Sequence, residues 1–268
     1  MENTQKIYAK LNLNLYIDGV DGAGYHNISS YVTTIDICDT ITVKRREDKE
    51  ITVTTLGYGL DIPKEQNNAY KACKAYMEKY GGFGYDITID KQIPIGGGLG
   101  GSSADICGVI KCLVQLNGSD EEGAMDLLRG LGSDTVYMYK GGFAHITGRG
   151  NDVKFMQSNA KMHFILAVPD FSVSSKEAFE LYDNLKPTNA FAEYFYNALE
   201  RGVAEKYPIL KEIRTKLKNS TEFGVSMTGS GSVIFAVYPD EISRNTAFES
   251  LIKDFKGLNV KLLKANSI

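Results

Sequence analysis

The stretch PIGGGLGGSSADI, residues 94–106, combines the residue types in this chain that are best suited to bind an anion. Five of its thirteen residues are glycine, and two serines follow them directly. Glycines let backbone N–H groups converge on an anion, and a helix that begins there adds the positive end of its dipole. Serine hydroxyls add donors and suit a Mg²⁺ ion held by the phosphates. We therefore predict a phosphate-binding loop made of Gly96, Gly97, Gly98, Leu99, Gly100, Gly101, Ser102 and Ser103.

Two common phosphate-binding patterns do not explain this loop. The P-loop pattern needs a lysine after its last glycine, and Ser102 stands there. The dinucleotide pattern GxGxxG is met by Gly96, Gly98 and Gly101. That fold also needs a second strand that ends in an acidic residue about 20 residues later, and residues 117–128 instead predict the start of a helix. A Rossmann oxidoreductase is a remote alternative, and a glycine turn without a ligand is a second. Asp105, in the first helical turn, caps the helix or places a cation.

The elements needed to position the loop are present on both sides of it. Alternation over residues 84–94 predicts a strand, and the apolar residues 104–118 predict a helix that ends at glycine. A second helix follows over 119–132, with Ser119 or Asp120 as its N-cap. Helices and strands mix without regular βαβ repetition, so we predict an α+β fold. Further strands are expected at 8–19, 31–46, 49–57, 162–170, 223–239 and 258–265, further helices at 64–81, 174–185, 190–220 and 243–257, a loop at 19–30, and short strands with turns at 132–153.

Composition and charge narrow the classes of protein. The 268 residues are 43% hydrophobic and 24% charged with a net charge of −3, which predicts neither a nucleic-acid nor a membrane partner. The four cysteines form no CxxC pair, and no signal peptide or bilayer-spanning run is found, so we expect reduced thiols and a cytoplasmic protein. We expect two lobes, residues 1–155 and 156–268.

Three motifs resemble the GHMP kinase family, the galactose, homoserine, mevalonate and phosphomevalonate kinases. These are YAKLNLNLYI near the N-terminus, the glycine loop itself, and SMTGSGSVIF near the C-terminus, in the family's order. The resemblance implies a two-lobed α+β kinase with an N-terminal lobe like ribosomal protein S5 domain 2 and a ferredoxin-like C-terminal lobe. It also implies ATP and Mg²⁺ as cofactors, and it gives no protein ligand for the metal.

The resemblance assigns a catalytic pair. Asp134, in LGSD, aligns with the family's catalytic aspartate, which accepts the proton of the substrate hydroxyl. Lys10, in AKLN, aligns with the lysine that neighbours this aspartate and stabilises charge on the transferring group. Without the resemblance, a turn aspartate and a solvated strand lysine would be the alternatives. The family has a small apolar residue and then proline after the aspartate, and this chain has Thr135 and Val136.

Further segments (GAGYHNI, LGSD and GGFAHITGRG) resemble the branch of the family that acts on a cytidine diphosphate-linked methylerythritol in non-mevalonate isoprenoid synthesis. There a tyrosine stacks on cytosine and a histidine hydrogen-bonds to it, which are Tyr25 and His26 in this chain. Phe179 aligns with the ring on the other face of the base, with a core helix residue as the alternative. The other predicted contacts are Asn12, Gly229 and Gly231 for the substrate and Asn68 for the nucleoside of ATP.

The resulting prediction is an ATP-dependent kinase of the 2-hydroxyl of that cytidine-linked alcohol. Its alternatives are a GHMP kinase of another small alcohol, such as a sugar, homoserine or mevalonate, and a catalytically silent nucleotide-binding paralogue. The stretch SVSSKEAF lacks the family's prolines, which leaves the first alternative open. The sequence is compatible with a monomer or a homodimer.

Overall fold

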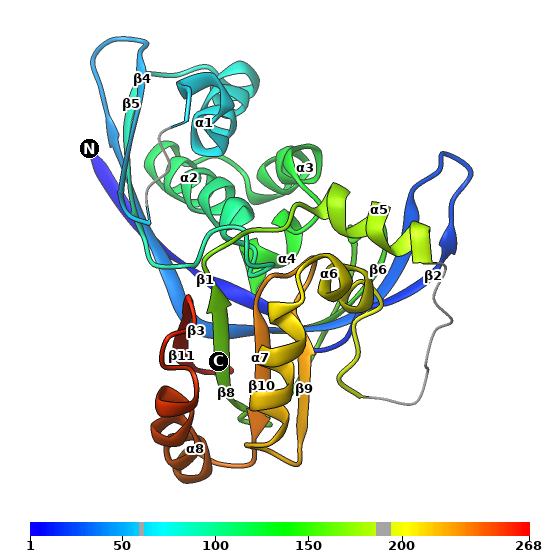
Figure 1. The fold of residues 1–268 in the computed structure, drawn as a ribbon. Helices are drawn as coiled ribbons and strands as arrows, with labels where there is room; N and C mark the ends of the chain where they lie inside the picture. The colour runs from blue at the N-terminus through cyan, green and yellow to red at the C-terminus, as the bar shows by residue number, and fades with distance from the viewer. Residues whose placement is uncertain (59–61, 186–193) are drawn as a thin grey trace. The chain divides into compact units, whose positions relative to one another are not determined.

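The computed structural model describes residues 1–58, 62–185 and 194–268 (Figure 1). These residues form two compact units that interleave along the chain. Strands β1 (Glu2–Asn12) and β3 (His26–Arg45) contribute residues to both units. The predicted lobe boundary between residues 155 and 156 stays a prediction. Unit 1 consists of Met1–Ala9, Ile37–Ile95 and Gly100–Gly141, and unit 2 of Lys10–Asp36, Gly96–Leu99 and Gly142–Ile268.

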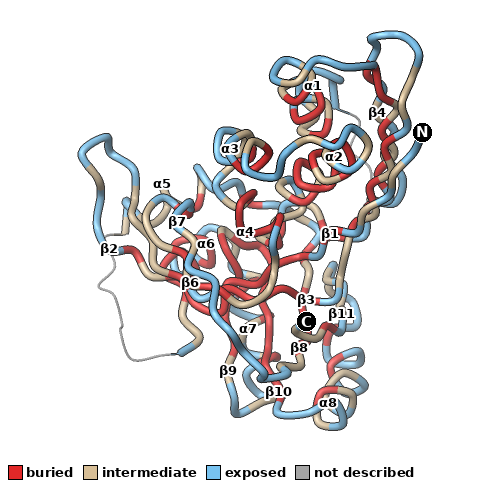
Figure 2. Tube along the Cα trace, turned by 180° about the vertical axis from the view of Figure 1, so that it is seen from behind, coloured by how far each residue is buried: buried red, intermediate tan, exposed pale blue. Residues whose placement is uncertain are grey.

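Unit 1 is built around one buried helix, α2 (Gly101–Asn117), which packs against the other helices of the unit (Figures 1 and 2). The buried side chains of α2 come from the apolar run by which the sequence predicted this helix. Gly118 ends the helix with a φ of +66°. Beside it, the second half of β3 pairs antiparallel with β5, and β5 pairs parallel with β4. The further elements of unit 1 are β4 (Ile51–Gly57), η1 (Lys64–Gln66), α1 (Asn68–Tyr80), β5 (Tyr85–Lys91), α3 (Glu121–Leu131) and α4 (Thr135–Lys140).

Two local predictions in unit 1 had different outcomes. Of the two predicted N-cap candidates, Ser119 and Asp120, the structure has Asp120 as the N-cap of α3, and its side chain accepts a hydrogen bond from the Gly123 N–H. The expectation of strands and turns over 132–153 is wrong for residues 135–140, which form α4. The sequence TVYMYK favours a strand by propensity, but α4 packs against α2 and α3, and such tertiary contacts override propensity.

Unit 2 contains a four-stranded antiparallel sheet in the order β11-β8-β10-β9. Helices α7 and α8 pack against this sheet (Figure 1). With β8, β9, β10 and β11 taken as first to fourth, the order fourth-first-third-second is the ferredoxin-like arrangement, as predicted. Residues 190–193 of the helical segment expected before Pro208 lie outside the described residues. The elements are β8 (His163–Pro169), α5 (Ser175–Leu185), α6 (Glu200–Lys206), α7 (Ile209–Lys218), β9 (Gly224–Met227), β10 (Ile234–Tyr238), α8 (Glu241–Asp254) and β11 (Val260–Asn266).

A second group of strands in unit 2 surrounds the first half of β3. β2 (Tyr16–Val20) and β6 (Phe143–Gly148) both pair antiparallel with it, and β7 (Asp152–Met156) pairs with β6. The expected loop over residues 19–30 is therefore too long, because β3 already begins at His26. The shorter connection, residues 21–25, places Tyr25 directly before the strand.

Candidate active site

The first half of the glycine loop, Gly96–Leu99, belongs to unit 2, and larger residues could not replace its three glycines without a close contact. Gly96 and Gly98 have φ values of +65° and +79°. A Cβ atom on Gly98 would lie 2.1 Å from the Thr228 carbonyl oxygen, and one on Gly96 would lie 2.1 Å from Ser172 Cβ. The glycines thus allow the left-handed backbone and also the close contact of this backbone with the segments around Ser172 and Thr228.

The second half of the loop belongs to unit 1 and leads into α2. Gly100, at a φ of +80°, is the N-cap of this 17-residue helix and supplies no side-chain cap to its first N–H groups. The Asn68 side-chain amide donates a hydrogen bond to Ser102 Oγ, so these two predicted ATP-binding residues lie together. A helix start of this kind, with two serines in its first turn, is suited to bind phosphate.

A buried charge cluster that the sequence did not reveal lies beneath this helix start. Lys91 Nζ lies 2.8 Å from Asp39 Oδ2 and 2.9 Å from both carboxylate oxygens of Asp105. Asp39 Oδ1 also accepts hydrogen bonds from the backbone N–H groups of Gln92 and Ile93. The cation that Asp105 contacts is therefore the Lys91 ammonium group, which ties the strand before the loop to the helix after it.

The charges of this cluster do not balance, since one ammonium group faces two carboxylates. Burial raises the pKa of Asp105 to about 6, although the charge of Lys91 opposes the shift. Burial alone would lower the pKa of Lys91, but the two carboxylates raise it above its usual value. Both raised pKa values favour the protonated forms of Lys91 and Asp105, which reduces the excess negative charge in the protein interior.

Lys10 and Asn12 lie next to each other on β1 in unit 2. Lys10 is only 5% exposed, and its Nζ donates a hydrogen bond to Asn12 Oδ1. The Asn12 side-chain amide donates to Ser30 Oγ at 2.7 Å, and its backbone N–H donates to Thr228 Oγ1 at 2.9 Å. The Lys10 backbone N–H donates to the Leu99 carbonyl at 3.0 Å, so these two predicted residues lie beside the glycine loop.

The turn after β9 also lies against the first half of the loop. A Cβ atom on Gly229 would lie 3.0 Å from the Gly98 carbonyl oxygen, and Gly229 has a φ of +55°. The turn is held by Asn197, whose side-chain amide donates to the carbonyls of Met227 and Gly229 at 2.8 Å each. Asn197 is buried and distant in sequence, so no local pattern could have identified it. Gly231, at a φ of +84°, lies in the same turn.

Asp134, in unit 1, directly precedes α4. The residue after it, Thr135, is fully buried, and its Oγ1 lies 2.6 Å from the Leu128 carbonyl and 2.7 Å from the Gly132 carbonyl. Cys107 Sγ lies 3.1 Å from the Thr135 carbonyl oxygen. These contacts fix the backbone directly before Val136, which stands where the family resemblance would place a proline, so Thr135 supplies stiffness by hydrogen bonding.

Tyr25 is 58% exposed at the end of the 21–25 connection in unit 2. Asp21 Oδ1 accepts the backbone N–H groups of Ala23 and Tyr25, and its Oδ2 lies 2.6 Å from Arg149 Nε. The hydrogen bond from the Tyr25 N–H is the main reason that the pKa of Asp21 is lowered. The Arg149 guanidinium lies 4.2 Å from the Tyr25 ring centroid, which leaves one face of the ring for another partner.

His26 is adjacent in sequence but has a different environment. Its ring stacks on Phe179, with centroids 4.8 Å apart and an interplanar angle of 16°. Its Nε2 lies 2.7 Å from Asp183 Oδ1. The structure thus brings His26 and Phe179 together, and Tyr25 lies against Arg149.

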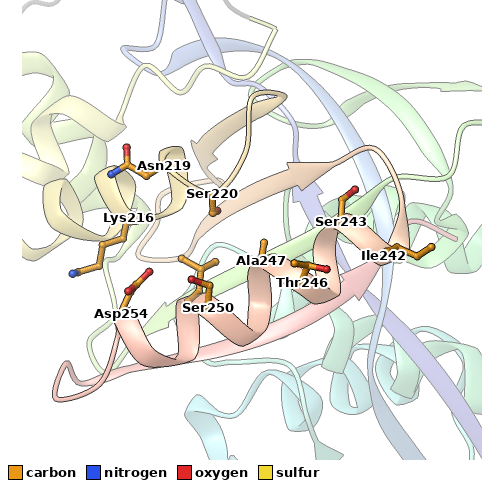
Figure 3. A pocket seen from close by; sticks show the side chains of 10 residues that line it. Lys216, Asn219, Ser220, Ile242, Ser243, Thr246, Ala247, Ser250 and Asp254 are labelled. Carbon is orange, nitrogen blue, oxygen red and sulfur yellow. The ribbon is translucent and has the colours of Figure 1, made fainter.

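Outside these residues, a groove of about 470 Å³ lies between α7 and α8 (Figure 3). Hydroxyl groups, Lys216 and Asp254 line it, and none of the predicted site residues does. Within the described ranges, no group of three or more histidine, cysteine, aspartate or glutamate residues is arranged to hold a metal ion. A search of the same residues for a helix long and apolar enough to cross a membrane finds none.

Comparison with known proteins identifies the family. The GHMP kinases N terminal domain matches residues 67–144, and the GHMP kinases C terminal domain matches residues 176–257. The chain is 31% identical to the 4-diphosphocytidyl-2-C-methyl-D-erythritol kinase of Clostridium beijerinckii, over 94% of this chain and 96% of that protein.

Solved structures share the fold. A crystal structure of 4-(cytidine 5'-diphospho)-2C-methyl-D-erythritol kinase has a TM-score of 0.82 at 23% identity and covers 99% of this chain and 100% of that one. The Methanococcus jannaschii mevalonate kinase has a TM-score of 0.70 at 17% identity and covers 100% of this chain and 99% of that one. The sequence-based assignment is confirmed, and the chain belongs to the GHMP kinase family.

Proposed function

We propose that this protein transfers the γ-phosphoryl group of ATP to the 2-hydroxyl of 4-diphosphocytidyl-2-C-methyl-D-erythritol. The observation that carries the proposal is the 31% identity, over nearly the full length of both chains, to a relative that bears the name of this kinase. The Tyr25-His26 pair at the start of β3 supports it, because an aromatic ring and an imidazole are side chains that suit a pyrimidine base.

The glycine loop would bind the phosphates of ATP. The left-handed glycines at 96 and 98, and the uncapped start of α2 after Gly100, present backbone N–H groups for this purpose. Asn68 would contact the nucleoside and is held by Ser102. Mg²⁺ fits this set as an ion bound mainly by the phosphates with a serine hydroxyl, since Asp105 is already engaged by Lys91. Bound there, the ion would neutralise phosphate charge.

Asp134 and Lys10 would carry the chemical step. Asp134 accepts the proton of the substrate 2-hydroxyl while the hydroxyl oxygen bonds to the γ-phosphorus of ATP. The bond between the γ-phosphorus and the β-phosphate oxygen breaks at the same time, which releases ADP. Lys10 supplies a buried positive charge that stabilises the transferring group, and Asn12 holds the Lys10 ammonium. Gly229 and Gly231 let the backbone pass close to the substrate.

The cytidine end of the substrate would bind at the start of β3. The face of Tyr25 opposite Arg149 would stack on cytosine, and His26 would hydrogen-bond to its edge. Phe179 was predicted to cover the other face of the base, and its stacking on His26 favours a supporting role as well.

The test is a substrate panel with Mg-ATP, in which ADP release is measured with the cytidine-linked alcohol, mevalonate, homoserine and a hexose. We expect turnover with the first compound and rates at least a hundredfold lower with the others. Turnover of another alcohol would instead establish the first alternative. A protein that binds ATP and turns over no alcohol would be the silent paralogue.

The setting of the protein is also a proposal. We propose that it works in the cytoplasm, with lobes 1–155 and 156–268, as a monomer or homodimer. Buried thiols at Cys73, Cys107 and Cys112 support a reducing compartment. Light scattering of the purified protein measures its oligomeric state.

A further inference from the structure

His26 is held on three sides by one helix, α5. Phe179 covers its face, Tyr182 meets it edge-on with centroids 5.8 Å apart and planes at 90°, and Asp183 Oδ1 lies 2.7 Å from Nε2. The histidine side chain is 12% exposed, whereas Asp183 is 56% exposed. Burial raises the pKa of Tyr182, which keeps its phenol neutral. The carboxylate is therefore the charged group that these contacts present to the imidazole.

The chemistry of the carboxylate decides which imidazole nitrogen carries the proton. An ionised aspartate only accepts hydrogen bonds, so Nε2 must be the N–H donor in this contact. In the neutral imidazole, Nδ1 is then an acceptor with a lone pair. Among the described residues, none donates a hydrogen bond to Nδ1. The stacking on Phe179 also restricts rotation of the ring, so the same nitrogen stays turned away from Asp183.

We propose that Asp183 is a positioning residue for His26. By fixing the imidazole, it makes His26 select cytosine, which carries an exocyclic amino group, over uracil, which carries a carbonyl group at the same ring position. This inference rests on the proposed function, because it concerns the base of the same substrate. The amino group of cytosine donates to an acceptor nitrogen, whereas the carbonyl of uracil would face it with a second lone pair. A site built for one pattern rejects the other because a polar group is left unsatisfied.

The experiment compares two substrates that differ only at this position, the cytidine-linked alcohol and its uridine analogue. The kcat/KM of each is measured for the wild type, for Asp183→Ala and for Glu180→Ala. Glu180 is a matched control, because it lies on the same helix, is 62% exposed and pairs only weakly with Lys176 at 3.9 Å. Binding of CDP and UDP by calorimetry gives the same comparison without turnover.

We expect the wild type and Glu180→Ala to prefer the cytosine compound equally, within about twofold. Asp183→Ala should lose about tenfold of that preference, in kcat/KM and in binding, with KM for ATP unchanged. An unchanged cytosine-to-uracil ratio in Asp183→Ala would overturn the inference, as would equal use of both compounds by the wild type. If the wild type phosphorylates neither compound, the proposed function fails, and the CDP and UDP titrations still decide the role of Asp183.

Discussion

Replacing Gly98 by alanine should damage both the stability of the protein and its phosphate loop. Alanine at a φ of +79° adopts the left-handed conformation at a cost of about 1–2 kcal/mol. Its Cβ would also lie 2.1 Å from the Thr228 carbonyl oxygen and 3.0 Å from its carbonyl carbon. Because these are backbone atoms, the loop must shift, and such overpacking costs roughly 1–3 kcal/mol more.

Gly118→Ala is the control that separates the two effects. Gly118 has a φ of +66°, and a Cβ atom there would have no heavy atom within 4 Å. This variant should lose only the conformational part, about 1–2 kcal/mol. Gly98→Ala should therefore be less stable than Gly118→Ala by roughly 1–3 kcal/mol, which corresponds to about 2–12 °C in Tm for a chain of this size.

Thermal unfolding and steady-state kinetics together test this reasoning. KM for ATP should rise about tenfold or more in Gly98→Ala and stay unchanged in Gly118→Ala. Equal Tm values for the two variants would show that the contact with Thr228 does not constrain the loop. An unchanged KM for ATP in a destabilised Gly98→Ala would show that the loop does not bind the nucleotide.

Thr135→Val should cost about 1–3 kcal/mol in chemical unfolding and lower kcat, because buried carbonyls lose their donor, whereas Thr135→Ser should retain both. Lys91→Met should cost about 3–5 kcal/mol, because it leaves two buried carboxylates without their cation. Folding raises the pKa of Asp105 from 3.8 to about 6, so the folded protein keeps a proton that the unfolded chain releases near pH 4. The stabilisation is therefore complete below pH 4, and the free energy of unfolding falls by about 3 kcal/mol as the pH rises through 6. Asp105→Asn should abolish this dependence of the unfolding free energy on pH. Tyr25→Leu should raise KM for the cytidine-linked alcohol about 5- to 150-fold and leave KM for ATP unchanged.

Each of these expectations has a result that contradicts it. Thr135→Ser that behaves like Thr135→Val would exclude the hydroxyl as the cause. Wild-type stability in Lys91→Met, or the same pH slope in Asp105→Asn and the wild type, would refute the charge cluster. Equal rises of both KM values in Tyr25→Leu would indicate general damage in place of lost stacking.

The sequence predicted what depends on local patterns. The apolar run of α2, an N-cap at Ser119 or Asp120 and the glycine before α2 are each read from a few adjacent residues, and the structure contains the run, the glycine and an N-cap at Asp120. The α+β class followed in the same way. The order of motifs identified the family, which no single motif could have done.

The contacts that the sequence did not reveal join residues far apart in the chain. Asp39 pairs with Lys91 across 52 residues, and His26 pairs with Asp183 across 157. Neither Asp39 nor Asp183 stands in a recognisable sequence pattern, because sheet pairing and helix packing determine which residues contact them. The helix α4 was missed because its β-branched and aromatic residues favour a strand, and its packing against α2 decides otherwise.

In the proposed reaction, Asp134 takes a proton from the alcohol while the glycine loop binds ATP. The most direct measurement is ADP release with Mg-ATP and 4-diphosphocytidyl-2-C-methyl-D-erythritol, for the wild type and Asp134→Asn, with ATP binding measured by calorimetry on both. We predict rapid turnover by the wild type and a kcat lower by about 10²- to 10⁴-fold in the variant, with equal ATP affinity. A kcat that stays within threefold of the wild type would contradict the assignment of Asp134 as the base.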